Sequence, residues 1–165
     1  MNKSIYVDPY DPATYDAAIK EIKAYKKWVK KKTLELCKKL AELGLEVAQI
    51  YFIPEAWNGN TDVTLTVEPL NNGYMLKASG EDVCFMEFGA GVTAGLGYDT
   101  SKVTPPVPIE KGSWSSTQGT GKFMKDGYWW YNGQMMDAIT PQMGMSHAVS
   151  EIQQRVTDVA REVFG

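Results

Sequence analysis

The chain has 165 residues, of which 44% are hydrophobic and 22% are charged, and its formal net charge is −3. This length suits one domain, and the apolar fraction is sufficient for a core, which argues against a disordered chain. No apolar run approaches the ~20 residues that span a bilayer, and no signal-peptide pattern is present, so we expect cytoplasmic synthesis and no membrane association. The two cysteines, Cys37 and Cys84, are too few for a disulfide framework, and we expect both to be reduced core residues.

The first element expected is a long helix over residues 11–44, preceded by an extended arm over residues 1–10. Asp11 can cap the first free amides, and Pro12 suits the first helical position because it has no N–H to satisfy. Gly44 is a typical residue for the end of a helix. Between these ends, apolar residues recur every three or four positions as one stripe: Tyr15, Ile19, Ile22, Tyr25, Val29, Leu36, Leu40 and Leu43.

The predicted helix is too long for the domain that contains it. It would extend about 48 Å at 1.5 Å per residue, which exceeds the diameter of a domain of this size. Part of the helix must therefore project from the domain or pack on another molecule. The apolar segment that follows, residues 45–52, is compatible with a strand or with a second short helix.

Positive charge is concentrated within the predicted helix. Residues 20–39 hold nine lysines against two glutamates, a local charge of +7, so the rest of the chain carries −10. This asymmetry suits docking onto neighbours of opposite charge, and we take Lys27, Lys30 and Lys31 as candidate interface residues. A solvated helix face is the simplest interpretation. Contact with DNA and contact with an acidic patch of a neighbouring subunit are the alternatives, since clustered lysines bind phosphate without sequence preference.

An antiparallel β-meander is expected over residues 61–88. Apolar and polar residues alternate over 63–68, as in a half-buried strand. The Asn-Asn-Gly sequence at 71–73 predicts a hairpin turn, because Asn-Gly tolerates positive φ, and leads into a return strand over 74–79. A third strand over 82–88 has apolar residues on both faces, which predicts a central position in the sheet.

A long loop and an aromatic segment follow. Residues 89–127 are rich in Gly, Pro, Ser and Thr without any period, and loops of such length in compact domains are commonly functional. The Tyr-Trp-Trp-Tyr segment at 128–131 could stack on sugars or bases. We favour packing or subunit contact and take Trp129, Trp130 and Tyr131 as further interface candidates.

The last element expected is a helix over residues 141–164, which has a helical apolar pattern. The order of helix, meander, loop and helix predicts a single α+β domain over residues 1–165. In this fold an antiparallel sheet is packed by the long N-terminal helix and the C-terminal helix, and carries the long Gly-rich loop.

Catalytic chemistry has few residues to draw on. His147 is the only histidine, which excludes metal sites built on several histidines. No local sequence signature supports a nucleophile pair of His147 with Cys37 or Cys84. A pair of catalytic carboxylates, such as Glu87 with Asp99, is a weaker interpretation of these acidic residues than scattered surface and capping acids. Residues 119–122 lack the spacing of a phosphate-binding loop. We therefore expect no enzyme activity, no catalytic residue, no metal and no cofactor.

The segment VCFMEFGAG at residues 83–91 resembles the hallmark of a phage family of tail-component and neck proteins at the head-to-tail junction. In many relatives this hallmark is an apolar strand followed by Glu-Phe-Gly-Thr-Gly and a variable loop. The long first helix, the approach at 72–83 and the aromatic segment at 128–134 also resemble that family, over roughly residues 15–163. Ala90 replaces a common threonine, and the entry to the last helix lacks the family's proline-rich pattern. The family-motif residues here are Phe85, Met86, Glu87, Phe88, Gly89 and Gly91.

The resemblance implies structural work in a virion, at the head–tail junction or tail end, after synthesis in the cytoplasm of a bacterial host. It implies a ring, hexameric by analogy, that joins or closes the head–tail interface. Its partners would be further copies of itself and neighbouring neck, tail-terminator or tail-tube proteins, with genome DNA passing nearby. The alternative function is a nucleic-acid-binding module outside a virion, and a third is a hydrolase that uses Glu87.

Glu87 lies within an apolar segment, so its carboxylate requires a hydrogen-bond donor. A backbone amide or a lysine of an adjacent subunit would serve, and a simple cap on a turn of its own chain is an equal alternative. Phe88 is expected to anchor the sheet, and Gly89 and Gly91 to permit a sharp exit from it with positive φ.

Overall fold

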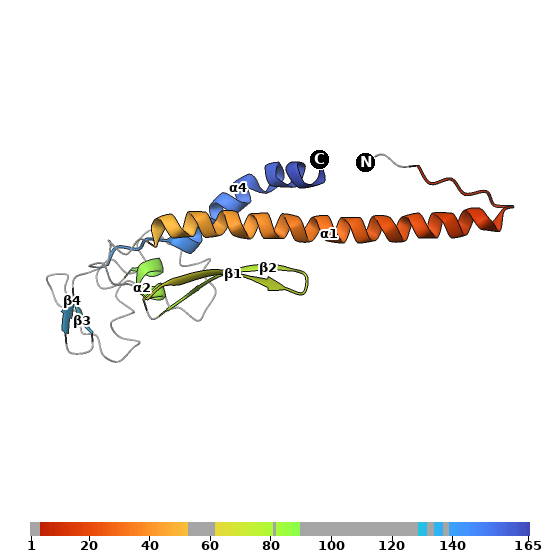
Figure 1. Ribbon diagram of the computed structural model, residues 1–165. Helices are drawn as coiled ribbons and strands as arrows, with labels where there is room; N and C mark the ends of the chain where they lie inside the picture. Colours follow the sequence, from red (N-terminus) through yellow and green to blue (C-terminus); the bar gives the residue numbers. More distant parts are fainter. Residues whose placement is uncertain (1–3, 53–61, 81, 90–128, 132–133, 137–138) are drawn as a thin grey trace.

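A computed structural model describes residues 4–52, 62–80, 82–89, 129–131, 134–136 and 139–165. Its elements, in chain order, are α1 (Pro12–Tyr51), β1 (Thr64–Leu70), β2 (Gly73–Ser79), α2 (Val83–Phe88), β3 (Trp129–Tyr131), β4 (Gln134–Met136) and α4 (Gly144–Phe164). The 40-residue α1 is a rod, with α4 along one side and the β1–β2 hairpin along the other (Figure 1). The α+β class, with its two terminal helices and antiparallel pairing, is confirmed. The predicted loop over residues 89–127 lies outside the described residues, except for Gly89.

The start of α1 is as expected. The Asp11 carboxylate accepts a hydrogen bond from the Ala13 amide at 3.0 Å, and proline occupies the first turn. The described arm residues turn back along this end of the helix (Figure 1). Thr14 holds the turn, because its hydroxyl accepts from the Asp8 amide at 3.0 Å and lies 3.1 Å from the Asp8 carbonyl oxygen.

The predicted helix end at Gly44 is wrong, because α1 continues through residues 45–51 to Tyr51. Gly44 is buried at the point where α4 and the hairpin both meet α1. A Cβ atom there would lie 2.8 Å from Cδ1 of Ile152 and 3.2 Å from Cδ2 of Leu76. The glycine therefore permits close approach of two elements and does not terminate the helix.

The hairpin forms as predicted, with Leu70 opposite Gly73 and Val67 opposite Leu76. Among the described residues, the positive φ values belong to Met143, Gly80, Gly89 and Gly165, so this turn does not use the positive φ that Asn-Gly permits. The strand predicted over 82–88 is wrong, because these residues form α2. Three consecutive residues, Phe85, Met86 and Glu87, are buried there. A short apolar run of this kind has no period that separates a strand from a helix.

The core lies where α1, α2, α4 and the hairpin meet. Its buried residues are Ala48, Phe52, Met86 and Ala148, with Val47, Val63, Leu65, Leu76 and Met145 packed around them. The Phe52 ring occupies the space over Gly144, where a Cβ would lie 2.5 Å from the ring. Small residues on both helices thus let α1 and α4 approach closely while one aromatic ring fills the gap.

The aromatic segment contributes β3, which pairs antiparallel with β4, Trp129 opposite Met136 and Tyr131 opposite Gln134. Trp129, Trp130 and Tyr131 form β3, and the packing of their side chains, on which the interface prediction depends, lies outside the described part of the chain. Tyr128 also lies outside it. Within the described ranges, no helix has the length and apolarity needed to cross a membrane. Both cysteines are free and half-buried.

Replacing Gly44 by leucine is expected to lower the free energy of unfolding by about 1–3 kcal/mol, because the new side chain must displace Ile152 and Leu76. Leucine at Glu46, which is exposed on the same helix, is the matched control and should change stability little. Urea unfolding of the two variants measures the difference. Equal stability would show that the contact at Gly44 is not close.

Candidate functional site

The family-like motif lies at the junction between α2 and α4, and Glu87 is its centre. This residue is only 5% exposed. Its Oε2 atom accepts a hydrogen bond from the Met145 amide at 2.8 Å, and its Oε1 atom accepts one from the Ser146 amide at 3.0 Å. The residue before α4, Met143, provides no side-chain cap and has a left-handed backbone. The α2 carboxylate therefore caps α4, where free amides and the helix dipole favour negative charge.

Backbone contacts reinforce this junction. The Gln142 amide donates to the Met86 carbonyl at 2.7 Å, and the Met143 amide donates to the Glu87 carbonyl at 3.3 Å. Gly89 has φ of 75°, and a Cβ there would lie 2.5 Å from the Ile139 carbonyl oxygen. The junction thus needs glycine both for its conformation and for the space.

The motif predictions are largely resolved by this geometry. Glu87 receives backbone amides of its own chain, which is the cap that the sequence left as one alternative. Phe85 and Met86 are buried and Phe88 is half-buried, but Phe88 does not anchor a sheet because residues 83–88 are helical. Positive φ at Gly89 is confirmed, and Gly91 lies outside the described residues. The motif therefore has a structural task within the chain.

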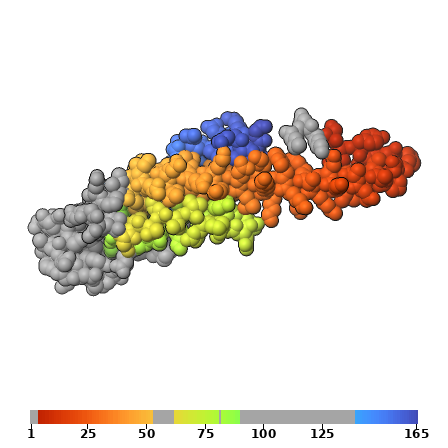
Figure 2. Space-filling view, in the orientation of Figure 1, coloured from red at the N-terminus to blue at the C-terminus, as the bar shows by residue number. Residues whose placement is uncertain are grey.

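A second candidate surface is the exposed apolar side of the first half of α1. We call Tyr15, Ile19, Ile22 and Tyr25 the N-terminal stripe, and each of them is 45–56% exposed. In the sequence, the N-terminal stripe is the first part of the apolar series of α1, and α4 and the hairpin cover later parts of this helix. The covered part begins at Trp28, whose ring meets Phe164 of α4 edge-on with centroids 5.9 Å apart. The red end of α1 extends past both α4 and the hairpin (Figure 2).

Tyr25 marks the boundary between the covered and uncovered parts of this side. Its ring stacks on Trp28 with centroids 5.7 Å apart, yet Tyr25 remains 56% exposed. The row of aromatic contacts that begins with Phe164 of α4 thus ends at Tyr25, more than half of which is exposed to solvent. The N-terminal stripe is therefore a continuation of an existing packing surface.

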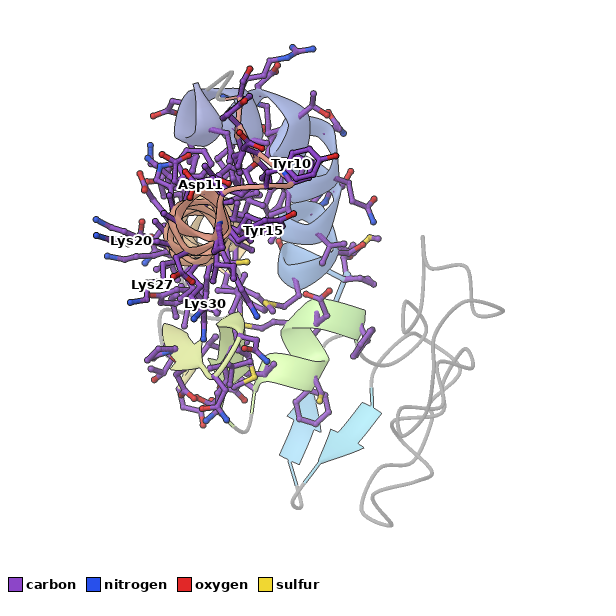
Figure 3. The ribbon with its side chains drawn as sticks, turned by 90° about the vertical axis from the view of Figure 1, so that its right-hand side faces the viewer. Tyr10, Asp11, Tyr15, Lys20, Lys27 and Lys30 are labelled. Carbon is purple, nitrogen blue, oxygen red and sulfur yellow. The ribbon has the colours of Figure 1, made fainter. Side chains whose placement is uncertain are left out.

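Three lysines of α1 point away from Tyr15 of the N-terminal stripe. Lys20 and Lys27 extend to the side of the helix opposite Tyr15, and Lys30 points toward a third side (Figure 3). Lys27, Lys30 and Lys31 are exposed. Within the described part of the chain they form no ion pair. The paired lysines lie farther along α1, where Lys32 meets Glu35 at 3.1 Å, Lys38 meets Glu42 at 3.5 Å and Lys39 meets Glu162.

The Lys39–Glu162 contact joins α1 to α4 at the surface. The hydrogen bond to Glu162 raises the pKa of Lys39, and the same bond lowers the pKa of Glu162. Both groups are solvated, so this pair contributes little to stability. The unpaired lysines before it keep their charge available to another molecule.

The described residues that were considered for catalysis pack against other parts of the fold. His147 stacks on Tyr51 with ring centroids 4.0 Å apart. Burial and the nearby Glu87 charge raise the pKa of the Cys84 thiol, which opposes its use as a nucleophile. Asp99 lies outside the described residues. Among those that are described, no group of three His, Cys, Asp or Glu side chains could hold a metal ion.

The sequence contained one signal for the Glu87 contact that its periodicity did not reveal. The residues just before α4, Gln142 and Met143, include none of the usual capping types. A helix without a local cap requires an acceptor from elsewhere in the structure. The acceptor is a carboxylate more than fifty positions earlier in the chain.

Comparison of this chain with protein-family models, with curated proteins and with solved structures finds no match. The family resemblance of residues 83–91 therefore stays an expectation.

Substitution of Glu87 by glutamine is expected to lower the free energy of unfolding by about 1–3 kcal/mol, because it removes a charge that accepts two buried hydrogen bonds. Alanine should cost more, since both amides then lose this acceptor. Urea unfolding measures the change. Glu68→Gln, which removes a surface pair with Lys77, is the control and should shift stability by less than about 0.5 kcal/mol. A Glu87→Gln variant as stable as the parent chain would contradict the capping role.

Alkylation of Cys84 should be several-fold slower in the folded chain than in the chain unfolded in urea, measured on a Cys37→Ser background. The raised pKa of the folded thiol leaves less thiolate at any given pH near 8, and half-burial limits access further. The onset of reaction should therefore move to higher pH on folding. Equal rates in the two states would contradict the thiol's protected environment.

Proposed function

We propose that the protein is a structural subunit of a tailed-phage virion, a ring-forming neck or tail-completion protein that joins or closes the head–tail interface. The observation that carries this proposal is the N-terminal stripe, four large apolar side chains on the first half of the 40-residue helix α1, each of them 45–56% exposed. The resemblance of residues 83–91 to neck and tail-component proteins supports the same function.

The physical argument begins with the exposure of the stripe. Single exposed apolar residues are ordinary, but a contiguous row of large ones is typical of an interaction surface. Most helical stability in proteins comes from packing of an amphipathic face. Within the described residues, Ala18 is buried on the first half of α1, but the four large side chains of the N-terminal stripe are exposed, so a partner molecule would cover them.

The charge distribution supports a role in assembly too. Lys20, Lys27 and Lys30 point away from Tyr15 of the stripe (Figure 3), and residues 20–39 carry +7 while the rest of the chain carries −10. Subunits with separated charges of opposite sign attract one another in a defined orientation. The expected partners are further copies of the chain and neighbouring neck, tail-terminator or tail-tube proteins in the virion.

Deletion of the gene tests this function. We expect lysates that contain DNA-filled heads and separate tails but no infectious particles, and mass spectrometry of purified parent virions should detect the protein in a fixed ratio to tail proteins. Complementation from a plasmid is the control. Infectious particles without the gene, or purified virions without the protein, would contradict a virion role.

Nucleic-acid binding through α1 is the second candidate, favoured by the unpaired, exposed lysines at 27, 30 and 31. It predicts that mobility-shift affinity for duplex DNA falls steeply as salt rises, and that replacing these three lysines by alanine reduces the salt dependence by about three phosphate contacts. Alanine at Lys77, which is paired with Glu68 on the hairpin, is the matched control. A parent chain that shows no DNA binding even at low salt would dismiss this candidate.

A further inference from the structure

The N-terminal stripe is nearly symmetric about its own centre. Its members are spaced by four, three and three residues, with two isoleucines inside and a tyrosine at each end. Helices pack through rows of side chains with this spacing. In an antiparallel pair centred between Ile19 and Ile22, Ile19 of each copy meets Ile22 of the other, and Tyr15 meets Tyr25. A second copy of the stripe therefore matches the first along its whole length.

Charge along the start of α1 changes sign across this centre. Residues 8–16 hold three aspartates and no basic residue, a charge of −3, whereas residues 23–32 hold six lysines and no acidic residue, a charge of +6. Residues 17–22 between them sum to zero. Asp8 belongs to the acidic end of the helix, because its amide donates to the Thr14 hydroxyl at 3.0 Å.

This separation of charge favours one orientation of two copies. An antiparallel pair places the acidic segment of each copy beside the basic segment of the other, and symmetry repeats that attraction. A parallel pair would place the two basic segments side by side. Lys26, which follows the stripe on the same row, then lies beside the first turn of the other copy and its carboxylates. Charge therefore selects the antiparallel arrangement.

One pair of opposite charges flanks the isoleucines. Asp16 and Lys23 are seven residues apart, which is about two helical turns, and both line the same surface hollow as Ile19. Both are exposed. Within the described residues, the ion pairs of α1 use other lysines, at positions 32, 38 and 39. In the antiparallel pair, Asp16 of each copy lies across from Lys23 of the other, so two identical ion pairs form.

The elements of the chain itself leave room for this partner. Phe164 at the end of α4 lies against Trp28, and Ile19 and Ile22 remain 49% and 55% exposed. The hairpin reaches α1 at Cys37, where a Cβ on Gly73 would lie 4.0 Å from the Sγ atom. The helix of the second copy would begin about two turns before that point. The two helices then overlap over about 18 residues, or about 27 Å at 1.5 Å per residue.

We infer that two copies of the chain pair antiparallel through the N-terminal stripe, with Ile19 against Ile22 and Asp16 against Lys23. Because a two-fold contact closes on itself, this interface gives a dimer. The pairing goes beyond the proposed function and does not depend on it. A ring built from such pairs needs a second contact at another surface.

Sedimentation velocity of the full chain over a concentration series tests the apolar part of the contact. The parent chain should dimerise, and Ile19→Asp with Ile22→Asp should weaken association by at least about 100-fold. Leu70→Asp is the control, because it places the same charge at a 55% exposed hairpin residue outside the stripe, and it should dimerise like the parent chain.

Circular dichroism and thermal unfolding establish that these variants are folded. If the aspartate pair unfolds the chain, serine at the same two positions replaces it and should weaken association by at least about tenfold, because the apolar contact is still lost.

An exchange of charges tests the orientation. Asp16→Lys alone sets two lysines against each other in both symmetric contacts, and should weaken dimerisation by about tenfold at low salt. Adding Lys23→Asp restores opposite charges across the interface and should return the affinity to that of the parent chain. The matched control adds Lys27→Asp instead. It has the same net charge, but Lys27 extends to the side of the helix opposite Tyr15 (Figure 3), so dimerisation should stay weak.

Each part of the inference has an outcome that overturns it. A parent chain that is monomeric at every concentration overturns the pairing, and so does a dimer that the isoleucine variants leave intact. Equal affinity of the two double charge variants overturns the antiparallel register. The virion role is tested separately, by gene deletion and by the content of purified particles. A chain that dimerises as described but is absent from virions would keep the pairing and lose the proposed function.

Discussion

The Glu87 carboxylate accepts hydrogen bonds from two amides at the start of α4, and the placement of α4 along α1 depends on that contact. A buried carboxylate is costly unless donors surround it, and the first turn of a helix has amides without acceptors. The carboxylate therefore receives the donors that it needs, and the amides receive an acceptor. The same contact fixes α2 against α4, and α2 supplies Met86 to the core shared with α1 and the hairpin. The junction thus holds α2 and the start of α4 against the core that α1 and the hairpin share.

Local signals predicted the elements whose ends are determined locally. Asp11 and Pro12 start α1, and the Asn-Asn-Gly turn separates β1 from β2, as the sequence indicated. Gly44 was misinterpreted because a glycine that ends a helix and one that admits a neighbouring helix have the same local sequence pattern. The distinction depends on Ile152 and Leu76, which are distant in sequence. Residues 83–88 were likewise misinterpreted, because a short apolar run in which Phe85, Met86 and Glu87 are all buried fits a strand as well as a helix.

The candidate surfaces were predictable in part. The need of Glu87 for a donor followed from a charge within an apolar segment, but its donors come from Met145 and Ser146, which no local pattern identifies. The apolar stripe of α1 followed from its three-to-four-residue spacing. Which part of this side of α1 is covered depends on where α4 lies, and the contact of Phe164 with Trp28 marks the end of the covered part. The excess length of the helix indicated a partner without indicating which residues contact it.

The two halves of α1 differ in packing, which gives one helix two local stabilities. The half beside α4 and the hairpin has Ala41, Gly44 and Ala48 buried, whereas Ala18 is the buried residue of the half that carries Tyr15 to Tyr25, so less packing opposes fraying there. In a free subunit its amides would exchange with solvent through small local openings, and contact with a neighbour would suppress that exchange. Part of the binding free energy is then used to order a helix end, as in coupled folding and binding. In the proposed assembly, such an interface would release readily between two subunits and would hold firmly only when several contacts form together.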